Sequence, residues 1–334
     1  ISVSRFNLIK EIKKQTSAKL ICVGDDWQSI YRFTGSDIDL FTNFGEYVGY
    51  YETLKLERTY RNSQDLINIA SEFILKNKKQ IDKRLKSDKK KSNPINIINY
   101  KENKLLAFEK ALKDIVSEHG DKAQITLLGR NNCDKNILSK DNTNGQYELK
   151  GNNDNVIVKS NKYPKLKINF FTVHKSKGLE ADNIIILNLE NKMAGFPNQI
   201  EYDPILDLVL TKSEKYPFAE ERRLFYVALT RTKNKCYILV PEINSSIFAD
   251  ELMDDFKLLG QSVDIKGDLK LVKCPKCQAG NLIHREDDKR NYSFLSCSNY
   301  PICDFKTNYV EILDNPIKCK SCGGFMVKRQ WNGE

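Results

Sequence analysis

Six cysteines near the carboxyl end of the sequence carry the clearest potential for metal chemistry. Four of them follow the spacing C-x2-C-x19-C-x5-C, and they are Cys274, Cys277, Cys297 and Cys303. Four thiolates in two clusters supply the tetrahedral sulfur environment that Zn²⁺ prefers in structural sites. In a reducing cytosol such pairs indicate a metal site rather than disulfides. The spacing therefore predicts a zinc-binding module.

Side chains that suit nucleic acid surround these cysteines. They are basic and aromatic, namely Arg285, Lys289, Arg290, Tyr292, Phe294 and Tyr300. Such groups can contact phosphates and stack on bases. Alternatively, the aromatic residues form the core of a module that is too small to fold without them. Cys319 and Cys322 resemble the first half of a second module, and two thiolates do not complete a zinc site. Whether this pair binds metal stays open.

A polar turn with one glutamine and two aromatic residues follows an apolar run at 19–23. The run has the pattern of a strand, and Gln28, Tyr31 and Phe33 come shortly after it. A glutamine just past the carboxyl end of a strand can reach a nucleotide phosphate. Exposed aromatic rings beside it can stack on unpaired bases. The alternative is an ordinary turn with two core aromatics.

Three later segments also carry groups that suit phosphates or a ribose. Tyr60 and Arg61 precede a helical pattern at 63–75, where the guanidinium can bind a phosphate. A predicted strand at 168–173 runs into a turn with Thr172, His174 and Glu180. A predicted helix at 219–231 ends in Arg231, which we expect to project freely, as fits a transferred phosphoryl group. Taken singly, each could be an ordinary surface or structural residue.

In this order the four segments resemble motifs III, IV, V and VI of the UvrD/Rep-type superfamily 1 DNA helicases. The matching strings are GDD-x-Q-S-I-Y, Y-R, T-x-H-x-x-K-G-L-E and E-E-R-R-x-x-Y-V-A-L-T-R, and the resemblance covers residues 1–250. Trp27, the Ala-Asp pair after Glu180 and the Gly-Phe-Pro at 195–197 are most similar to the helicase IV branch. The cysteine module resembles the C4 zinc finger of type IA topoisomerases, which binds single-stranded DNA.

The resemblance implies an ATP-dependent DNA helicase that moves 3′ to 5′ along single-stranded DNA. Gln28 would sense the γ-phosphate of ATP, Arg61 would reach the same phosphate, and Arg231 would act as an arginine finger. These three residues are the implied catalytic set. Tyr60 would stack on adenine, and Glu180 would hold the ribose.

The resemblance also implies a path for single-stranded or partly duplex DNA. Tyr31 and Phe33 would stack on its bases, while Thr172 and His174 would line the path. Arg130, in the string QITLLGRNN, matches a further family motif and would contact DNA as well.

Two features of the family pattern do not occur in the sequence. It contains no G-x-x-x-x-G-K-[ST] loop for the phosphates and no strand that ends in the Asp-Glu pair for magnesium. We therefore expect the 334 residues to be the carboxyl-terminal part of a helicase and to have negligible ATPase activity alone. Only a short stretch separates Arg130 from Thr172, so the accessory subdomain should be missing or reduced to a hairpin.

Alternating strand and helix patterns predict an α/β fold with a mainly parallel sheet. With the resemblance, this becomes a RecA-like lobe, part of a second lobe and a zinc ribbon. The expected divisions are the end of the first lobe, the second lobe, a linker, a C4 zinc finger and an incomplete second finger, at residues 1–55, 56–250, 251–272, 273–312 and 313–334.

Composition agrees with a basic protein that binds nucleic acid. Lys and Arg number 54 against 44 Asp and Glu, for a net charge of +10. Nine of the sixteen residues at 76–91 are Lys or Arg, which is typical of a solvated loop and less often of a DNA contact. No apolar run is long enough to cross a membrane, and no leader opens the sequence, so we expect a cytoplasmic location.

Two alternatives to a helicase part remain at this stage. A degenerate helicase lobe could serve as a non-enzymatic DNA-binding scaffold, although a scaffold needs no phosphate sensors. A helicase–nuclease fusion is weaker, because no nuclease-like carboxylate cluster is visible. The sequence does not identify the preferred DNA structure, the repair or recombination pathway, the protein partners or the oligomeric state.

Overall fold

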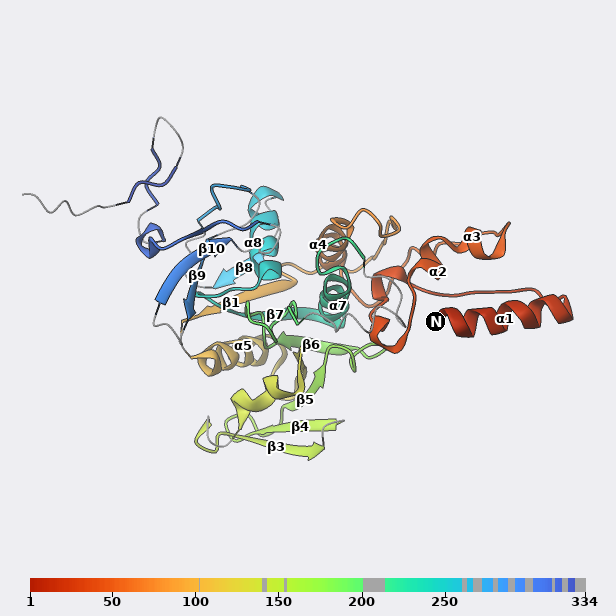
Figure 1. Cartoon of the computed structure of the whole chain (residues 1–334). Helices are drawn as coiled ribbons and strands as arrows, with labels where there is room; N and C mark the ends of the chain where they lie inside the picture. The colour runs from red at the N-terminus through yellow and green to blue at the C-terminus, as the bar shows by residue number, and fades with distance from the viewer. Residues whose placement is uncertain are drawn as a thin grey trace, which may run out of the picture.

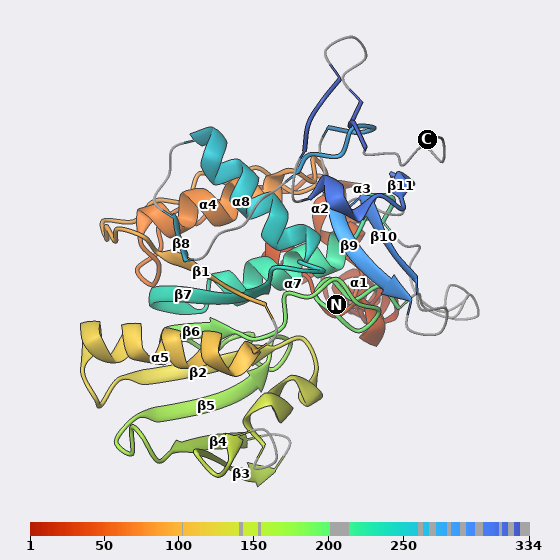
Figure 2. The same ribbon diagram turned by 90° about the vertical axis from the view of Figure 1, so that its left-hand side faces the viewer.

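The computed structural model describes most of the chain, and Figures 1 and 2 show it from two sides. The described residues are 1–101, 103–139, 143–152, 155–200, 214–259, 263–266, 272–278, 282–287, 292–297, 303–313, 316–319 and 324–327. No helix among them is long and apolar enough to cross a membrane.

An eight-stranded sheet in the order β3-β4-β5-β2-β6-β7-β1-β8 forms the centre of the molecule (Figure 2). Neighbouring strands from β5 to β8 pair in parallel, whereas β3 and β4 form an antiparallel hairpin at one edge. The strands are β1 (Ile95–Tyr100), β2 (Gln124–Gly129), β3 (Tyr147–Asn152), β4 (Asn155–Ser160), β5 (Lys167–Thr172), β6 (Ala181–Ile186), β7 (Thr232–Pro241) and β8 (Val263–Lys266). The predicted α/β class with a mainly parallel sheet is confirmed.

Helices cover both faces of this sheet, and the buried residues of its central strands are mostly apolar. One core cluster joins the sheet to α4 (Gln64–Leu75), α7 (Ala219–Leu229) and α8 (Ile247–Leu259). A second cluster packs α5 (Lys104–His119) and η3 (Asn132–Leu138) against the other face. Ser63 caps α4, since its hydroxyl accepts a hydrogen bond from the Leu66 N–H.

The amino-terminal segment extends away from the sheet (Figure 1). It contains α1 (Val3–Thr16), η1 (Asp26–Gln28), η2 (Arg32–Thr34), α2 (Asp39–Thr42) and α3 (Phe44–Val48). The predicted strand at 19–23 is wrong, because these residues have no regular structure and Ile21 and Val23 are 87% and 90% exposed. A strand needs a neighbour to pair with, and no described residue pairs with this run.

Two further differences, and one agreement, concern pairing that the local pattern does not specify. β1 forms where no strand was predicted, and β7 and β8 pair with it on either side. The expected linker at 251–272 instead holds the end of α8 and the whole of β8. The polar region after Arg130 contains η3 and the β3–β4 hairpin, which agrees with a reduced accessory subdomain.

A small antiparallel sheet forms the cysteine module. Its strands are β9 (Leu282–Asp287), β10 (Tyr292–Cys297) and β11 (Lys306–Thr307), followed by η5 (Val310–Ile312). Its buried core contains Val272, Leu282, Leu295 and Ile312 together with three of the four cysteines. The aromatic residues Tyr292 and Phe294 stack on each other with ring centroids 5.7 Å apart, and Tyr292 is 43% exposed.

Candidate nucleotide and DNA site

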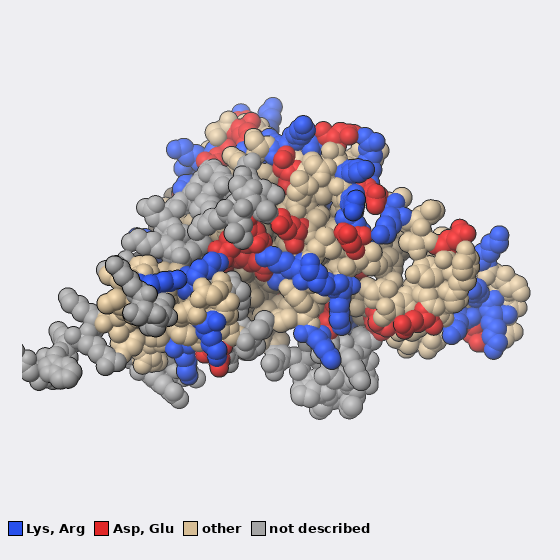
Figure 3. Space-filling model, turned by 90° about the horizontal axis from the view of Figure 1, so that it is seen from above, with Lys and Arg blue, Asp and Glu red and all other residues tan. Residues whose placement is uncertain are grey.

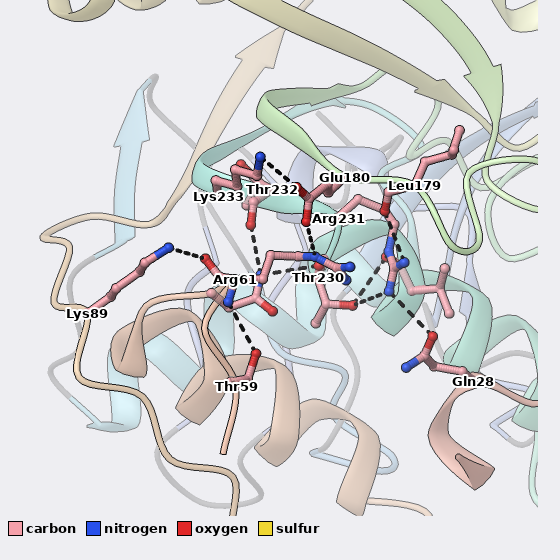
Figure 4. A network of polar contacts seen from close by, with 12 residues as sticks. Gln28, Thr59, Arg61, Lys89, Leu179, Glu180, Thr230, Arg231, Thr232 and Lys233 are labelled. Carbon is pink, nitrogen blue, oxygen red and sulfur yellow. Dashed lines mark hydrogen bonds and ion pairs between the residues drawn. The ribbon is translucent and has the colours of Figure 1, made fainter. Parts of the chain in front are cut away.

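Four of the residues predicted to contact ATP lie in one network (Figure 4). The Arg231 Nη2 lies 3.4 Å from Gln28 Oε1, and the Arg61 Nε donates to Glu180 Oε2 at 3.2 Å. These side chains come from the turn at η1, the segment before α4, the turn after β5 and the end of α7. The fold therefore brings together residues that are up to 203 positions apart.

The Arg231 guanidinium is buried rather than free to project, which corrects our expectation. The residue is 3% exposed, and its Nε and Nη1 donate to the Val227 and Leu179 carbonyl oxygens. Among the described residues, no carboxylate lies within ion-pair distance of it. Burial, and next the positive charge of Arg61, lower the pKa of Arg231 to about 10. A buried cation held only by neutral oxygens is suited to an anionic ligand.

Arg61 and Glu180 form the more exposed side of the network. Glu180 pairs with Lys233 at 2.6 Å as well as with Arg61, and both contacts lower the pKa of its carboxyl group. Tyr60 is 74% exposed, and the Arg58 guanidinium lies 5.8 Å from its ring centroid. An exposed ring beside an ion pair is open to a planar ligand.

Tyr31, Phe33 and His174 form an aromatic cluster next to this network. Their ring centroids are 5.5 to 6.2 Å apart, and Phe33 is 48% exposed. Burial, and next the charge of Arg130, lower the pKa of His174 to about 4, so the imidazole is neutral at pH 7. The cluster therefore offers uncharged rings to a partner.

The other two residues predicted to contact DNA are engaged within the protein. Arg130 makes a two-pronged contact with the Glu221 carboxylate, at 3.0 Å from Nε and 2.7 Å from Nη2. Thr172 is 8% exposed, and its hydroxyl accepts a hydrogen bond from the Lys175 N–H. Thr172 thus holds the turn that carries His174, whereas Arg130 is paired with α7, and the contact of either residue with DNA stays a prediction.

Sequence reasoning missed the residues that hold the turn at η1. Lys177 donates to the Gln28 carbonyl oxygen at 2.9 Å, and its ammonium lies 5.0 Å from the Tyr31 ring centroid. The Arg223 Nε donates to the Ser29 carbonyl oxygen, and Glu220 accepts from the Arg32 N–H. The E-E-R-R string and the lysine before Gly178 were the available signals, but neither reveals a contact across the fold.

The four predicted zinc ligands form one cluster. Cys274, Cys277, Cys297 and Cys303 place their sulfur atoms within 4.8 Å of one another. Two of the sulfur pairs are 3.8 and 3.5 Å apart. A tetrahedral zinc ion with bonds of about 2.3 Å would require sulfur atoms about 3.8 Å apart. The cluster therefore fits zinc, which would act as a structural ion because all four positions are occupied by protein.

Comparison with protein families agrees with this geometry. Residues 149–242 match the UvrD-like helicase C-terminal domain, and residues 2–48 match the UvrD/REP helicase N-terminal domain. The chain therefore contains regions similar to both UvrD-like helicase domains. Residues 271–312 match the topoisomerase DNA-binding C4 zinc finger, so this UvrD-like chain also carries the predicted zinc-finger module.

Several curated helicases are similar to this UvrD-like chain. DNA helicase IV from Escherichia coli is 32% identical over 75% of this chain and 34% of that protein. A probable DNA helicase from Mycoplasma pneumoniae is 24% identical over 73% of this chain and 42% of that protein. DNA helicase II from Haemophilus influenzae is 29% identical over 41% of this chain and 19% of that protein. The chain thus spans less than half the length of these relatives.

Proposed function

We propose that the chain is the carboxyl-terminal part of an ATP-dependent helicase that moves 3′ to 5′ along single-stranded DNA. The observation that carries this proposal is the buried Arg231 guanidinium, whose hydrogen bonds within the described residues go to neutral oxygens, Gln28 included. Such a site favours the helicase over a scaffold, because a scaffold gains nothing from a buried, uncompensated cation.

Within this proposal each group in the network has a distinct task. Arg231 and Arg61 stabilise the negative charge on the transferred phosphoryl group, and Gln28 senses that group. Tyr60 stacks on the adenine, and Glu180 accepts a hydrogen bond from the ribose. ATP and its magnesium ion also require ligands beyond these residues. The division at residue 55 stays part of the proposal, whereas α8 and β8 extend the second lobe beyond residue 250.

DNA would bind over the cluster of Tyr31, Phe33 and His174, and the zinc finger would add a second contact. Aromatic stacking contributes about 1–3 kcal/mol per base and tolerates any sequence. The excess of basic residues does not by itself locate the DNA path. Figure 3 shows Lys and Arg distributed over one face of the molecule with Asp and Glu between them, rather than one continuous basic surface.

We expect ATP hydrolysis by the purified 334-residue chain to equal the background rate, with or without single-stranded DNA. The physical reason is that its phosphate-binding groups are arginine and glutamine side chains, without a loop of backbone N–H groups to hold the β-phosphate. A phosphate-release assay checks this. Hydrolysis that rises when DNA is added would contradict it.

Replacing Phe33 with alanine should weaken binding of a single-stranded oligonucleotide by about 5- to 100-fold, the loss of one stacked base. Fluorescence anisotropy over a range of salt concentrations measures the affinity and the number of phosphate contacts. Tyr50→Ala is the matched control, because Tyr50 is 91% exposed in the segment before α4. Equal affinities for both variants would contradict the assigned DNA path.

A further inference from the structure

We infer that Lys83 is a positioning residue that holds the Gln28 turn and the DNA-stacking rings in place. The inference rests on the proposed function of that turn and deepens it. Lys83 lies in the basic stretch at 76–91, which the sequence pattern indicated to be a solvated loop. Its side chain is only 16% exposed.

The stretch at 81–88 is extended, and its residues alternate between two environments. Odd-numbered residues are partly covered and even-numbered residues are exposed. Lys86 lies beside Arg58 as an isolated parallel bridge, which fixes the stretch against the segment before α4. Alternation with a period of two places Ile81, Lys83, Leu85 and Ser87 on the inner side. Residues 81–88 therefore cross the turn at η1, and this segment is called the strap below. Its basic side chains do not share one exposed face.

Two inner residues of the strap bind the turn directly. The Lys83 ammonium pairs with Asp25 at 2.6 Å and with Asp26, and it lies 4.9 Å from the Trp27 ring centroid. The Ile81 N–H donates to Asp26, and the Ile81 carbonyl oxygen accepts from the Trp27 indole N–H at 2.9 Å. Asp26 and Trp27 are almost completely buried, so Lys83 compensates a carboxylate that water cannot solvate.

The Asp25 carboxylate connects Lys83 to Gln28, which lies on the side of the turn that faces the proposed nucleotide site. Asp25 accepts from the Gln28 Nε2 at 2.5 Å and from the Trp27 N–H at 3.1 Å. Gln28 in turn lies against Arg231. Lys83 touches neither the proposed phosphate position nor the aromatic cluster, and it acts on both through Asp25 and the turn. Tyr31 follows Gln28 by three residues, so a displaced turn would also displace the stacking rings.

Three variants test this role in the whole chain, each made with Trp331→Phe so that Trp27 is the remaining tryptophan. Lys83→Met removes the charge and keeps the length of the side chain. We expect its Trp27 emission to shift to longer wavelength and its affinity for a single-stranded oligonucleotide to fall about 5- to 10-fold, as a misplaced stacking ring predicts. Lys83→Arg keeps the charge and should retain both properties. Lys90→Met is the matched control, because it removes an exposed charge from the same stretch.

Two outcomes would overturn the inference. One is a Lys83→Met protein that unfolds at a lower temperature yet keeps the Trp27 emission and the oligonucleotide affinity of Lys90→Met. Lys83 would then contribute to stability alone. The other is a Lys83→Arg protein that behaves like Lys83→Met. If Lys83→Met does not fold, Asp25→Ala replaces it, because the Asp25 side chain is 35% exposed and the Lys83–Asp26 pair remains. Unchanged affinity in Asp25→Ala would equally overturn the inference.

Failure of the proposed function can be told apart from failure of this inference. If the unaltered chain binds no oligonucleotide, the proposed function fails, and the emission of Lys83→Met alone decides the role of Lys83.

Discussion

Removing zinc with a strong chelator should unfold the cysteine module while the large sheet stays folded. Among the described residues, seven buried ones form the core of the module and three of these are zinc ligands, so little apolar burial remains there without the ion. Structural zinc contributes about 10–16 kcal/mol of apparent binding free energy in comparable small modules. Elemental analysis should give at least one zinc per chain, and amide resonances of β9 to β11 should lose their dispersion after chelation.

Variants at single cysteines separate this effect from a general loss of stability. Cys297→Ser removes one ligand and should abolish tight zinc binding by the module. Cys133→Ser changes an exposed cysteine in η3 and should leave zinc content and spectra unchanged. A Cys297→Ser protein that retains its zinc and its module resonances would contradict a four-thiolate site.

Replacing Arg222 with methionine should lower the free energy of unfolding of the large sheet by about 3–5 kcal/mol. Its side chain is 6% exposed and binds Glu251 at 2.6 and 2.8 Å. The guanidinium also lies 4.4 Å from the Phe73 ring centroid and 5.2 Å from that of Phe248. Methionine fills much of the same space but leaves Glu251 with Lys76 as its remaining cation. Urea unfolding monitored by circular dichroism measures the change.

An exposed ion pair provides the control for this prediction. Arg58 pairs with Asp88, and their side chains are 58% and 78% exposed, so Arg58→Met should cost less than about 1 kcal/mol. Adding Glu251→Gln to Arg222→Met should recover part of the loss, because the double variant no longer buries an incompletely paired carboxylate. If Arg222→Met and Arg58→Met lower the free energy of unfolding equally, the buried ion pair contributes no more to stability than the exposed one, which contradicts the prediction.

The sequence predicts this fold well wherever local pattern and pairing agree. β6 ends in a continuous apolar run at 184–186, and α4 has both a helical period and a serine cap. The run at 19–23 has the same apolar character but is not a strand, because a strand depends on a partner that no local pattern specifies. β1 was missed for the converse reason, since asparagines interrupt its apolar residues and only β7 and β8 reveal it.

For the candidate site, the order of the four motif-like segments identified the residues. It did not predict how deeply each side chain is buried or which groups it contacts. The meeting of Gln28 with Arg231 agrees with the motif order. The burial of Arg231, the engagement of Arg130 by Glu221 and the inner position of Lys83 could not be read from residue types. Each depends on which polar groups lie opposite, and that is set by packing between segments more than 50 residues apart.

The tight packing around α7 has a consequence for the strength of ligand binding. Arg231 lies two residues after this helix, nine of whose residues are buried, and carbonyl oxygens already fix its guanidinium. A flexible arginine would lose about 2 kcal/mol of rotamer entropy when it orders around a ligand. Arg231 loses that rotamer freedom when the protein folds. Its guanidinium is therefore pre-organised, and binding a phosphate would cost little additional side-chain entropy.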